Sequence, residues 1–275
     1  MSSPVKVVRV NGRAVDPDTP ALRLDDPLAR AGDGLIETMR ARNHRVFRLD
    51  QHLERLHGSA RALSMSGLPG DDRIRAELDA ILAAAGPGDL QIRLAVSSAP
   101  TLWVEAQSTE PLAMEPRALT AITMPGSWRP ELFTAQHKTS SRALWSWAER
   151  RARETGADTA LLLDEQGRMG EATTASVFVR TPRAVLTAPV RGLLRGVGRG
   201  VMMELVPDVV ERAATREEWE TAEEIVLVSA LRGVSAVTSV DGEPIGTGRP
   251  GPMARGQQAA YRLVVEAATG GPGLS

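Results

Sequence analysis

The chain has 275 residues, of which 42% are hydrophobic and 24% charged, with a formal net charge of −1 and no cysteine. This composition suits one large or two modest domains in the cytoplasm. The near-neutral charge argues against nucleic acid as a partner, and the lack of an apolar run of roughly 18 residues argues against a membrane. Disulfides are excluded, and no pair among the four histidines has the spacing of a zinc-binding helix, so we expect no metal site.

The N-terminal part is predicted to mix sheet and helix. β-branched residues flank Asn11-Gly12, which is a strong hairpin signal. Apolar residues at helical spacing predict a helix from about Asp50, and a second helix, "RIRAELDAILAAAG", closes at Gly86. "LQIRLAVSS" and "TLWVEAQS" are predicted strands, and the proline-containing stretch 109–116 is the best candidate for a domain link. We therefore predict a smaller N-terminal domain over residues 1–112.

The C-terminal part also mixes the two kinds of element. "LTAITM" is a predicted strand, and a helix is predicted over residues 140–155, with Ser140 and Ser141 as its cap. "TALLLDEQGRMGEATTASVFVRT" predicts two strands about a turn at residues 165–167, "EIVLVSAL" is a buried strand, and residues 254–269 form a closing helix. Strand and helix do not alternate strictly, which favours an α+β fold with a larger C-terminal domain over residues 113–275.

Lysine usage is the most unusual feature of this chain. Of its 33 basic residues only Lys6 and Lys138 are lysines, and the others are arginines. An arginine stays protonated, whereas a partly desolvated lysine can become neutral and form an imine with a carbonyl group. Lys138, in "AQHKTSSR", lies at a predicted strand-to-helix junction. We predict that it has a chemical role, with an ordinary surface lysine as the alternative.

Three further segments carry candidate ligand-binding groups. Gly196, Gly198 and Gly200 precede a helical run in "RGLLRGVGRGVMMEL", where backbone N–H groups could hold a phosphate. Glu171, in "RMGEATTASVF", lies between apolar strands and could face a ligand, while Arg55, in "HLERL", is by default a solvated helix charge. Considered singly, a plain glycine turn and a solvated turn carboxylate are the better explanations of the first two.

The order of the motifs "GDGLIETMR", "RLDQHLERL", "HKTSSR", "GEATTASVF", "GLLRGVGR" and "VSALRGVSAV" resembles the fold-type IV pyridoxal-phosphate enzymes, the class IV aminotransferase family, from about Gly32 to Val237. The resemblance implies a two-domain α+β fold with a smaller N-terminal domain and a larger pseudo-barrel domain. It also implies pyridoxal 5'-phosphate as cofactor, a small-molecule amino substrate, and a homodimer with the active site at the domain junction.

The resemblance assigns roles by position. Lys138 corresponds to the lysine that joins the cofactor through an imine, and Glu171 to the carboxylate at its pyridinium nitrogen. Arg55 corresponds to the arginine on the cofactor phosphate, and the backbone of Val197 and Gly198 to the phosphate-binding turn. These are the residue types that the chemistry needs, because a lysine freed from the cofactor is also a general base.

Two positions depart from the family pattern at the expected phosphate site. The usual threonine of the phosphate turn is Gly198 here. In the late loop, Ala230 stands where many aminotransferases have a phosphate-binding threonine, and Ser229 is adjacent. A cofactor-poor binding protein that kept the fold is therefore one alternative, although the lysine, glutamate and arginine speak against it.

The 33-residue gap from Lys138 to Glu171, and Thr38, look most like 4-amino-4-deoxychorismate lyase. The predicted reaction forms 4-aminobenzoate and pyruvate, as in folate biosynthesis, with Thr38 assisting proton transfer. "AVSSAPTLWVE" lacks the arginine of those lyases, so Arg40 and Arg232 are the candidate contacts for a substrate carboxylate. The alternative is an aminotransferase that acts on D- or branched-chain amino acids or on amines.

Overall fold

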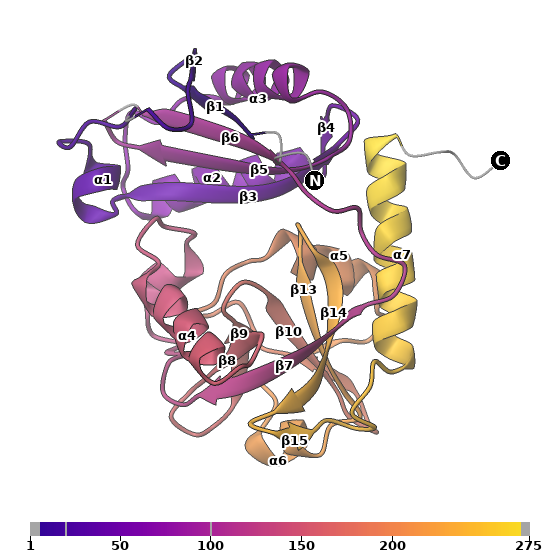
Figure 1. Ribbon diagram of the computed structural model, residues 1–275. Coiled ribbons are helices and arrows are strands. Elements are labelled where there is room, and N and C mark those ends of the chain that lie inside the picture. Colours follow the sequence, from indigo (N-terminus) through magenta and orange to yellow (C-terminus); the bar gives the residue numbers. More distant parts are fainter. Residues whose placement is uncertain (1–5, 20, 100, 271–275) are drawn as a thin grey trace. The chain divides into compact units, whose positions relative to one another are not determined.

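The computed structural model describes residues 6–19, 21–99 and 101–270, and it divides into two compact units (Figure 1). The first unit contains the described residues up to Pro111, the segment Lys138–Ser141 and the chain from Val264 onward; the second contains Leu112–His137 and Arg142–Leu263. The division at Pro111 falls inside the predicted link. Two later segments, Lys138–Ser141 and the described residues from Val264, group with the first unit.

The first unit is built on a six-stranded antiparallel sheet in the order β2-β1-β6-β5-β3-β4. Asn11 and Gly12, with φ of 48° and 86°, form the predicted hairpin turn, since a two-residue turn of this kind requires positive φ at both central positions. The strands are β1 (Lys6–Val10), β2 (Arg13–Val15), β3 (Gly34–Arg42), β4 (Arg45–Val46), β5 (Asp89–Ser97) and β6 (Leu102–Ser108).

Two helices cover one face of this sheet, α2 (Leu49–Ala62) and α3 (Asp71–Ala85), and a short helix α1 (Pro27–Ala31) precedes β3. Their apolar stripes pack on alternate residues of β3, β5 and β6 in one buried cluster that includes Leu35, Leu53, Ile74, Leu78 and Ile92. Because side chains alternate along a strand, Ile36, Thr38 and Arg40 project from the opposite face of β3.

The second unit contains a nine-stranded sheet in the order β12-β11-β10-β13-β14-β7-β8-β9, with β15 beside β14. β9 also pairs with β10, so β10, β13, β14, β7, β8 and β9 form a closed ring, which confirms the predicted pseudo-barrel and the α+β class. The strands are β7 (Arg117–Met124), β8 (Thr159–Leu163), β9 (Met169–Ala172), β10 (Ser176–Arg180), β11 (Val185–Thr187), β12 (Val210–Glu211), β13 (Glu224–Ser229), β14 (Gly233–Val240) and β15 (Glu243–Pro244).

The helices of this unit are α4 (Ala143–Glu154), α5 (Val197–Leu205), α6 (Arg216–Glu220) and α7 (Pro252–Thr269, yellow in Figure 1), together with a 3-10 turn at Phe133–Gln136. The residues of α7 from Val264 belong to the first unit. β8 is buried along its whole length, with Leu161 and Leu163 in the barrel core and Ala160 and Leu162 against α4. Among the described residues, no helix has both the length and the apolar character needed to cross a membrane.

Two sequence predictions differ from this arrangement. Residues 159–181 form three strands rather than two, because the chain reverses again between Ala172 and Ala175, where the Ala172 N–H donates to the Ala175 carbonyl at 2.9 Å. That turn contains neither glycine nor proline, so it lacks a local signal. The helix predicted from Ser140 begins three residues later, at Ala143, because residues 138–141 are used differently.

Candidate active site

Lys138 is held in the first unit by a short antiparallel pairing with the start of β3. The Ile36 N–H donates to the Lys138 carbonyl and the Ser140 N–H donates to the Gly34 carbonyl, each at 2.8 Å, around the bridge between Leu35 and Thr139. The same alignment sets Lys138 opposite Ile36. Hydrogen bonds to β3 therefore fix the backbone from the carbonyl of the predicted imine-forming lysine to Ser140.

Ser140 and Ser141 do not cap α4, contrary to the sequence prediction. Their hydroxyls donate instead to the Gly32 carbonyl, Ser140 at 2.5 Å and Ser141 at 3.0 Å, and the cap position of α4 is Arg142, without a side-chain capping bond. The two serines thus anchor the segment after Lys138 to the loop before β3, which explains why the helix starts late.

Thr38 lies two residues beyond Ile36 on the same face of β3. Lys138 lies opposite Ile36, so Thr38 is its diagonal neighbour across the antiparallel pair. Residues in this relation are within reach of a long side chain. The register also pairs Thr38 with Arg93 of β5, an exposed arginine that the sequence reasoning overlooked. A hydroxyl and a cation therefore share one sheet face beside the lysine segment.

Arg55 takes part in a buried charge cluster with Glu37 and His52. Its Nε and Nη2 donate to the two carboxylate oxygens of Glu37 at 2.9 and 2.5 Å, and His52 Nδ1 lies 2.7 Å from Glu37 Oε2. Burial raises the pKa of Glu37, but the Arg55 charge and the hydrogen bonds from His52 and Arg55 outweigh it and lower that pKa to about 2. Burial also lowers the pKa of His52. The carboxylate is thus ionised and the imidazole neutral at pH 7.

This cluster corrects the default interpretation of Arg55 as a solvated charge, because only 9% of its side chain is exposed. A bidentate carboxylate partner fixes the plane and the direction of the guanidinium. Such a pre-oriented arginine suits a cofactor phosphate, and its contact with that phosphate stays a prediction. Neither Glu37 nor His52 was singled out from the sequence, since a glutamate in a strand and a histidine in a helix carry no local signal of pairing.

Arg40 is buried in the first unit, with 2% of its surface exposed. Its guanidinium is paired with Asp89 of β5 and donates to the Glu110 carbonyl at 3.0 Å. These contacts give Arg40 a structural ion pair, and its predicted contact with a substrate carboxylate stays a prediction.

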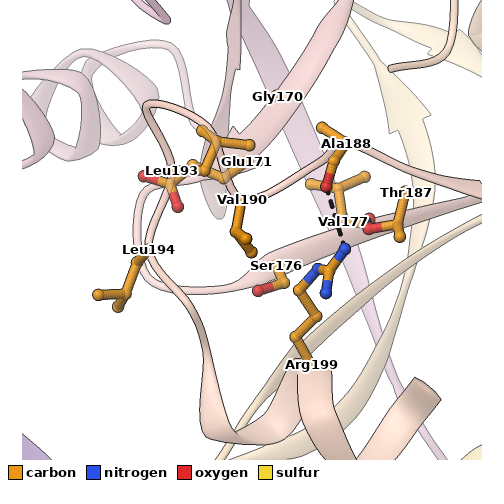
Figure 2. Close-up of a pocket in the computed structure, with 10 residues that line it drawn as sticks. All are labelled: Gly170, Glu171, Ser176, Val177, Thr187, Ala188, Val190, Leu193, Leu194 and Arg199. Atoms are coloured by element: carbon orange, nitrogen blue, oxygen red, sulfur yellow. Dashed lines mark hydrogen bonds between the residues drawn. The ribbon is translucent and has the colours of Figure 1, made fainter. Parts of the chain in front are cut away.

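Glu171 lies at the seam where the barrel of the second unit closes, since β9 and β10 meet through the pair Glu171 and Ser176. It is 8% exposed and lines a small pocket with Ser176, Val190, Leu193 and several other residues (Figure 2). Its Oε1 accepts a hydrogen bond from the indole nitrogen of Trp145 at 2.9 Å. The predicted partner of the cofactor nitrogen is therefore a shielded carboxylate held by a donor that the sequence did not point to.

The predicted phosphate-binding residues come together at the N-terminus of α5. A Cβ placed on Gly198 would lie 2.7 Å from the Ser229 carbonyl carbon and 2.9 Å from the Ala230 nitrogen, so the two backbones touch. A Cβ on Gly196 would likewise lie 2.8 Å from the hydroxyl of Ser176, the residue paired with Glu171. The first N–H groups of a helix have no intrahelical acceptor and attract anions. Val197, Gly198, Ser229 and Ala230 thus form one backbone cradle near Glu171.

Arg232 follows this cradle on the turn between β13 and β14. Its backbone N–H donates to the Ser229 hydroxyl at 3.1 Å, and its exposed side chain lines a second pocket together with Arg117, Glu149 and Ser229. A role in binding a substrate carboxylate stays a prediction for this residue.

The donor set fits pyridoxal 5'-phosphate. Within the first unit the fitting groups are the amine of Lys138 and the oriented guanidinium of Arg55. Within the second unit they are the carboxylate of Glu171 and the backbone cradle at the start of α5. The lost threonine hydroxyl at position 198 is matched by a closer approach of the helix to the Ser229–Ala230 backbone, which only a residue without a Cβ permits.

The chain is similar to a known family and to several known proteins. A family model described as amino-transferase class IV matches residues 34–240. The chain is 27% identical to a D-alanine aminotransferase of Bacillus licheniformis, over 93% of this chain and 95% of that one, and 27% identical to the branched-chain-amino-acid aminotransferase-like protein 1 of Arabidopsis thaliana. The match covers 88% of this chain but only 47% of the Arabidopsis protein, so the chain spans about half of that relative's length.

A similar solved structure is a hypothetical aminotransferase of Mycobacterium tuberculosis in its PLP-bound form, with a TM-score of 0.81, 25% identity, and coverage of 96% of this chain and 98% of that one. The range matched by the family model includes the segments that carry Lys138, Glu171 and the start of α5.

Proposed function

This chain belongs to the class IV aminotransferase family, whose fold-type IV members use pyridoxal 5'-phosphate, and we propose that it transfers the amino group of a branched-chain or D-amino acid to a 2-oxo acid. The observation that carries the substrate class is the match to a D-alanine aminotransferase over nearly the full length of both chains, alongside relatives named as branched-chain aminotransferases. The order of preference is therefore the reverse of the sequence-based one, in which the lyase came first.

The proposed roles follow from the chemistry of each side chain. When bound, pyridoxal phosphate supplies an electron-withdrawing ring that stabilises negative charge at the substrate's α-carbon. Lys138 Nζ would hold the cofactor and then move the α-proton as a general base. Glu171 would keep a proton on the ring nitrogen, and the backbone at Val197 and Gly198, with Arg55, would fix the phosphate so that the ring cannot turn.

Arg93 is the candidate contact for a substrate carboxylate. It is exposed, and the strand register pairs it with Thr38 on the sheet face beside which the Lys138 segment is held. An arginine recognises a carboxylate through two parallel hydrogen bonds. Arg232 is the second candidate, from the turn after Ser229.

The aminodeoxychorismate lyase reaction is the second candidate function, and Thr38 is the observation that favours it. A hydroxyl on the same face as the lysine segment suits proton delivery to a departing enolpyruvyl carbon. None of the relatives named above is a lyase, which is why the aminotransferase is preferred.

One product assay separates the two reactions. The purified protein, loaded with pyridoxal phosphate, is given L-leucine, L-valine or D-alanine with 2-oxoglutarate, and in a separate reaction 4-amino-4-deoxychorismate. We expect a new 2-oxo acid and glutamate in equal amounts from at least one amino acid, and no 4-aminobenzoate. Release of 4-aminobenzoate and pyruvate that is lost in a Thr38→Ala variant would instead establish the lyase.

We also propose that the enzyme is a homodimer, as the family resemblance implies. Light scattering would then give a mass near twice the chain mass of 29.4 kDa. A fully active species with the mass of one chain would contradict this.

A further inference from the structure

Trp145 makes a directed contact with the carboxylate that is assigned to the cofactor nitrogen. It lies in the first turn of α4, and its indole Nε1–H donates to Glu171 Oε1 at 2.9 Å. An indole nitrogen can only donate, so this bond favours the ionised form of the carboxylate over the protonated form. Since one carboxylate oxygen is tied to the indole, the plane of the carboxyl group is also restrained.

Trp145 is itself held by Arg142, the residue at the cap of α4. The guanidinium carbon of Arg142 lies 3.8 Å from the centre of the Trp145 ring, which is a cation-π contact. Arg142 Nη2 also donates to the Thr173 carbonyl at 3.3 Å, two residues after Glu171. Trp145 and Arg142, from the start of α4, therefore hold the short segment 171–173 through two hydrogen bonds, one at each end.

The positive charge stacked on the indole strengthens the electrostatic effect of this arrangement. A cation over the ring draws electron density from the indole and makes its N–H a better donor to an anion. Glu171 is 8% exposed, so its interactions are less screened by solvent than those of a surface carboxylate. The protonation of a group that binds beside Glu171 consequently depends on how Trp145 holds the Glu171 carboxylate.

We propose that Trp145, braced by Arg142, is a positioning residue that orients Glu171 and keeps it ionised, and so controls the affinity and the protonation state of the bound cofactor. The inference rests on the proposed function, because it takes Glu171 as the partner of the cofactor nitrogen. It adds a residue that acts through that carboxylate rather than on the substrate.

The experiment compares the holoenzyme with Trp145→Phe, which keeps an aromatic ring but loses the N–H donor. Trp147→Phe is the matched control, because Trp147 lies on the same helix and is 46% exposed. Two readouts are measured: the pyridoxal-phosphate dissociation constant by fluorescence titration, and the pH midpoint of the visible absorbance of the bound cofactor. Trp145→His, which retains a ring N–H, tests for rescue, and Trp145→Phe is repeated in a Glu171→Gln background.

We expect Trp145→Phe to weaken cofactor binding roughly tenfold, the order expected for a hydrogen bond to a charged group, and to move the absorbance midpoint by about one pH unit. Trp147→Phe should match the wild type, and Trp145→His should recover part of both effects. In the Glu171→Gln background the loss should shrink to less than about twofold, since coupled residues are not additive.

Three results would overturn the inference: a Trp145→Phe protein indistinguishable from Trp147→Phe in both readouts, an undiminished effect in the Glu171→Gln background, or a folded Trp145→His protein with no recovery. If Trp145→Phe does not fold, as judged by circular dichroism, Trp145→His decides alone. If the wild type transfers amino groups and Trp145→Phe matches it in both readouts, this inference is wrong and the proposed function still stands. A wild type that binds no pyridoxal phosphate defeats both.

Discussion

At the scale of single residues, the structure places the two lysines of this chain in different environments, which the composition alone could not distinguish. Lys6 is on the outer part of the first sheet, with 44% of its side chain exposed and a loose ion pair of 3.8 Å to Glu105. Lys138 is only half-buried, but its carbonyl accepts a hydrogen bond from β3, and Ser140 donates another to the same strand. A fixed backbone reduces the entropy that the side chain must lose to reach one geometry.

Replacing Lys138 by arginine keeps the positive charge and removes the ability to form an imine. We expect Lys138→Arg to give no cofactor adduct after borohydride reduction and peptide mass mapping, and to lose roughly 10²–10⁴-fold in kcat, the range of a general base. Lys6→Arg is the matched control and should match the wild type in both measurements. An adduct that persists in Lys138→Arg would refute the assignment.

The Glu37 carboxylate makes a second prediction at this scale, about stability and pH. Its pKa falls from 4.5 to about 2 in the folded protein, so the stability it contributes, about 3 kcal/mol, is present above pH 4.5 and is lost as the pH falls toward 2. Glu37→Gln leaves the Arg55 charge buried beside a neutral partner, which costs about 3–5 kcal/mol.

Urea unfolding of the wild type and of Glu37→Gln at pH 7, 5 and 3.5 measures this difference. The two proteins should differ most at pH 7 and converge as the pH falls below 4.5. A difference that stays constant across the series would show that folding does not lower the pKa of Glu37.

At the scale of elements, the N-terminus of α5 packs directly on the turn after β13 because Gly198 has no side chain. Gly198 touches the Ser229–Ala230 backbone. A Cβ on Gly200, two residues further along the same helix, would meet nothing within 4 Å. The two glycines therefore have different physical reasons to be there, although both look alike in the sequence.

Gly198→Ala forces two backbones apart, and overpacking of this kind costs about 1–3 kcal/mol. We expect it to lower the melting temperature and to weaken pyridoxal-phosphate binding roughly tenfold, because the cradle N–H groups move. Gly200→Ala should instead stabilise the protein by up to about 1 kcal/mol and leave cofactor binding unchanged. Equal effects of the two substitutions would contradict the packing argument.

The segment after Lys138 is a second case in which an element is positioned by a distant partner. Ser140→Ala combined with Ser141→Ala removes two hydrogen bonds to the Gly32 carbonyl, each worth about 1 kcal/mol. We expect kcat to fall about tenfold with little change in cofactor affinity, since Glu171 and the α5 cradle are untouched. Ser146→Ala, on the exposed face of α4, is the control and should change neither.

At the scale of the whole molecule, the chain forms two units, and neither unit is one continuous stretch of sequence. The first unit takes Lys138–Ser141 out of a stretch that otherwise belongs to the second. A ligand that binds only the folded protein stabilises the native state by mass action.

Pyridoxal phosphate at 100 times its dissociation constant should therefore add about 2.7 kcal/mol, which raises the melting temperature by about 5–10 °C. Differential scanning fluorimetry with and without the cofactor measures the shift. Lys138→Arg should retain less than half of it, because the covalent link is missing. A wild-type melting temperature that does not respond to pyridoxal phosphate would count against the cofactor assignment for this chain.

The order of motifs and the local patterns determined much of this protein from sequence alone. The hairpin at Asn11-Gly12 and the helices α2, α3 and α7 follow from short-range signals, which are turn chemistry and periodicity. The scarcity of lysine pointed to Lys138, whereas the roles predicted for Glu171 and Arg55 came from the order of the motifs along the chain. Only the tertiary structure decided how residues 138–141 pair with β3, how β9 closes the barrel, and how Arg55 and Trp145 meet carboxylates. The reason is physical: Ser140 bonds Gly32 from 108 residues away, and such long-range pairing depends on which surfaces meet after folding rather than on the pattern of neighbouring residues.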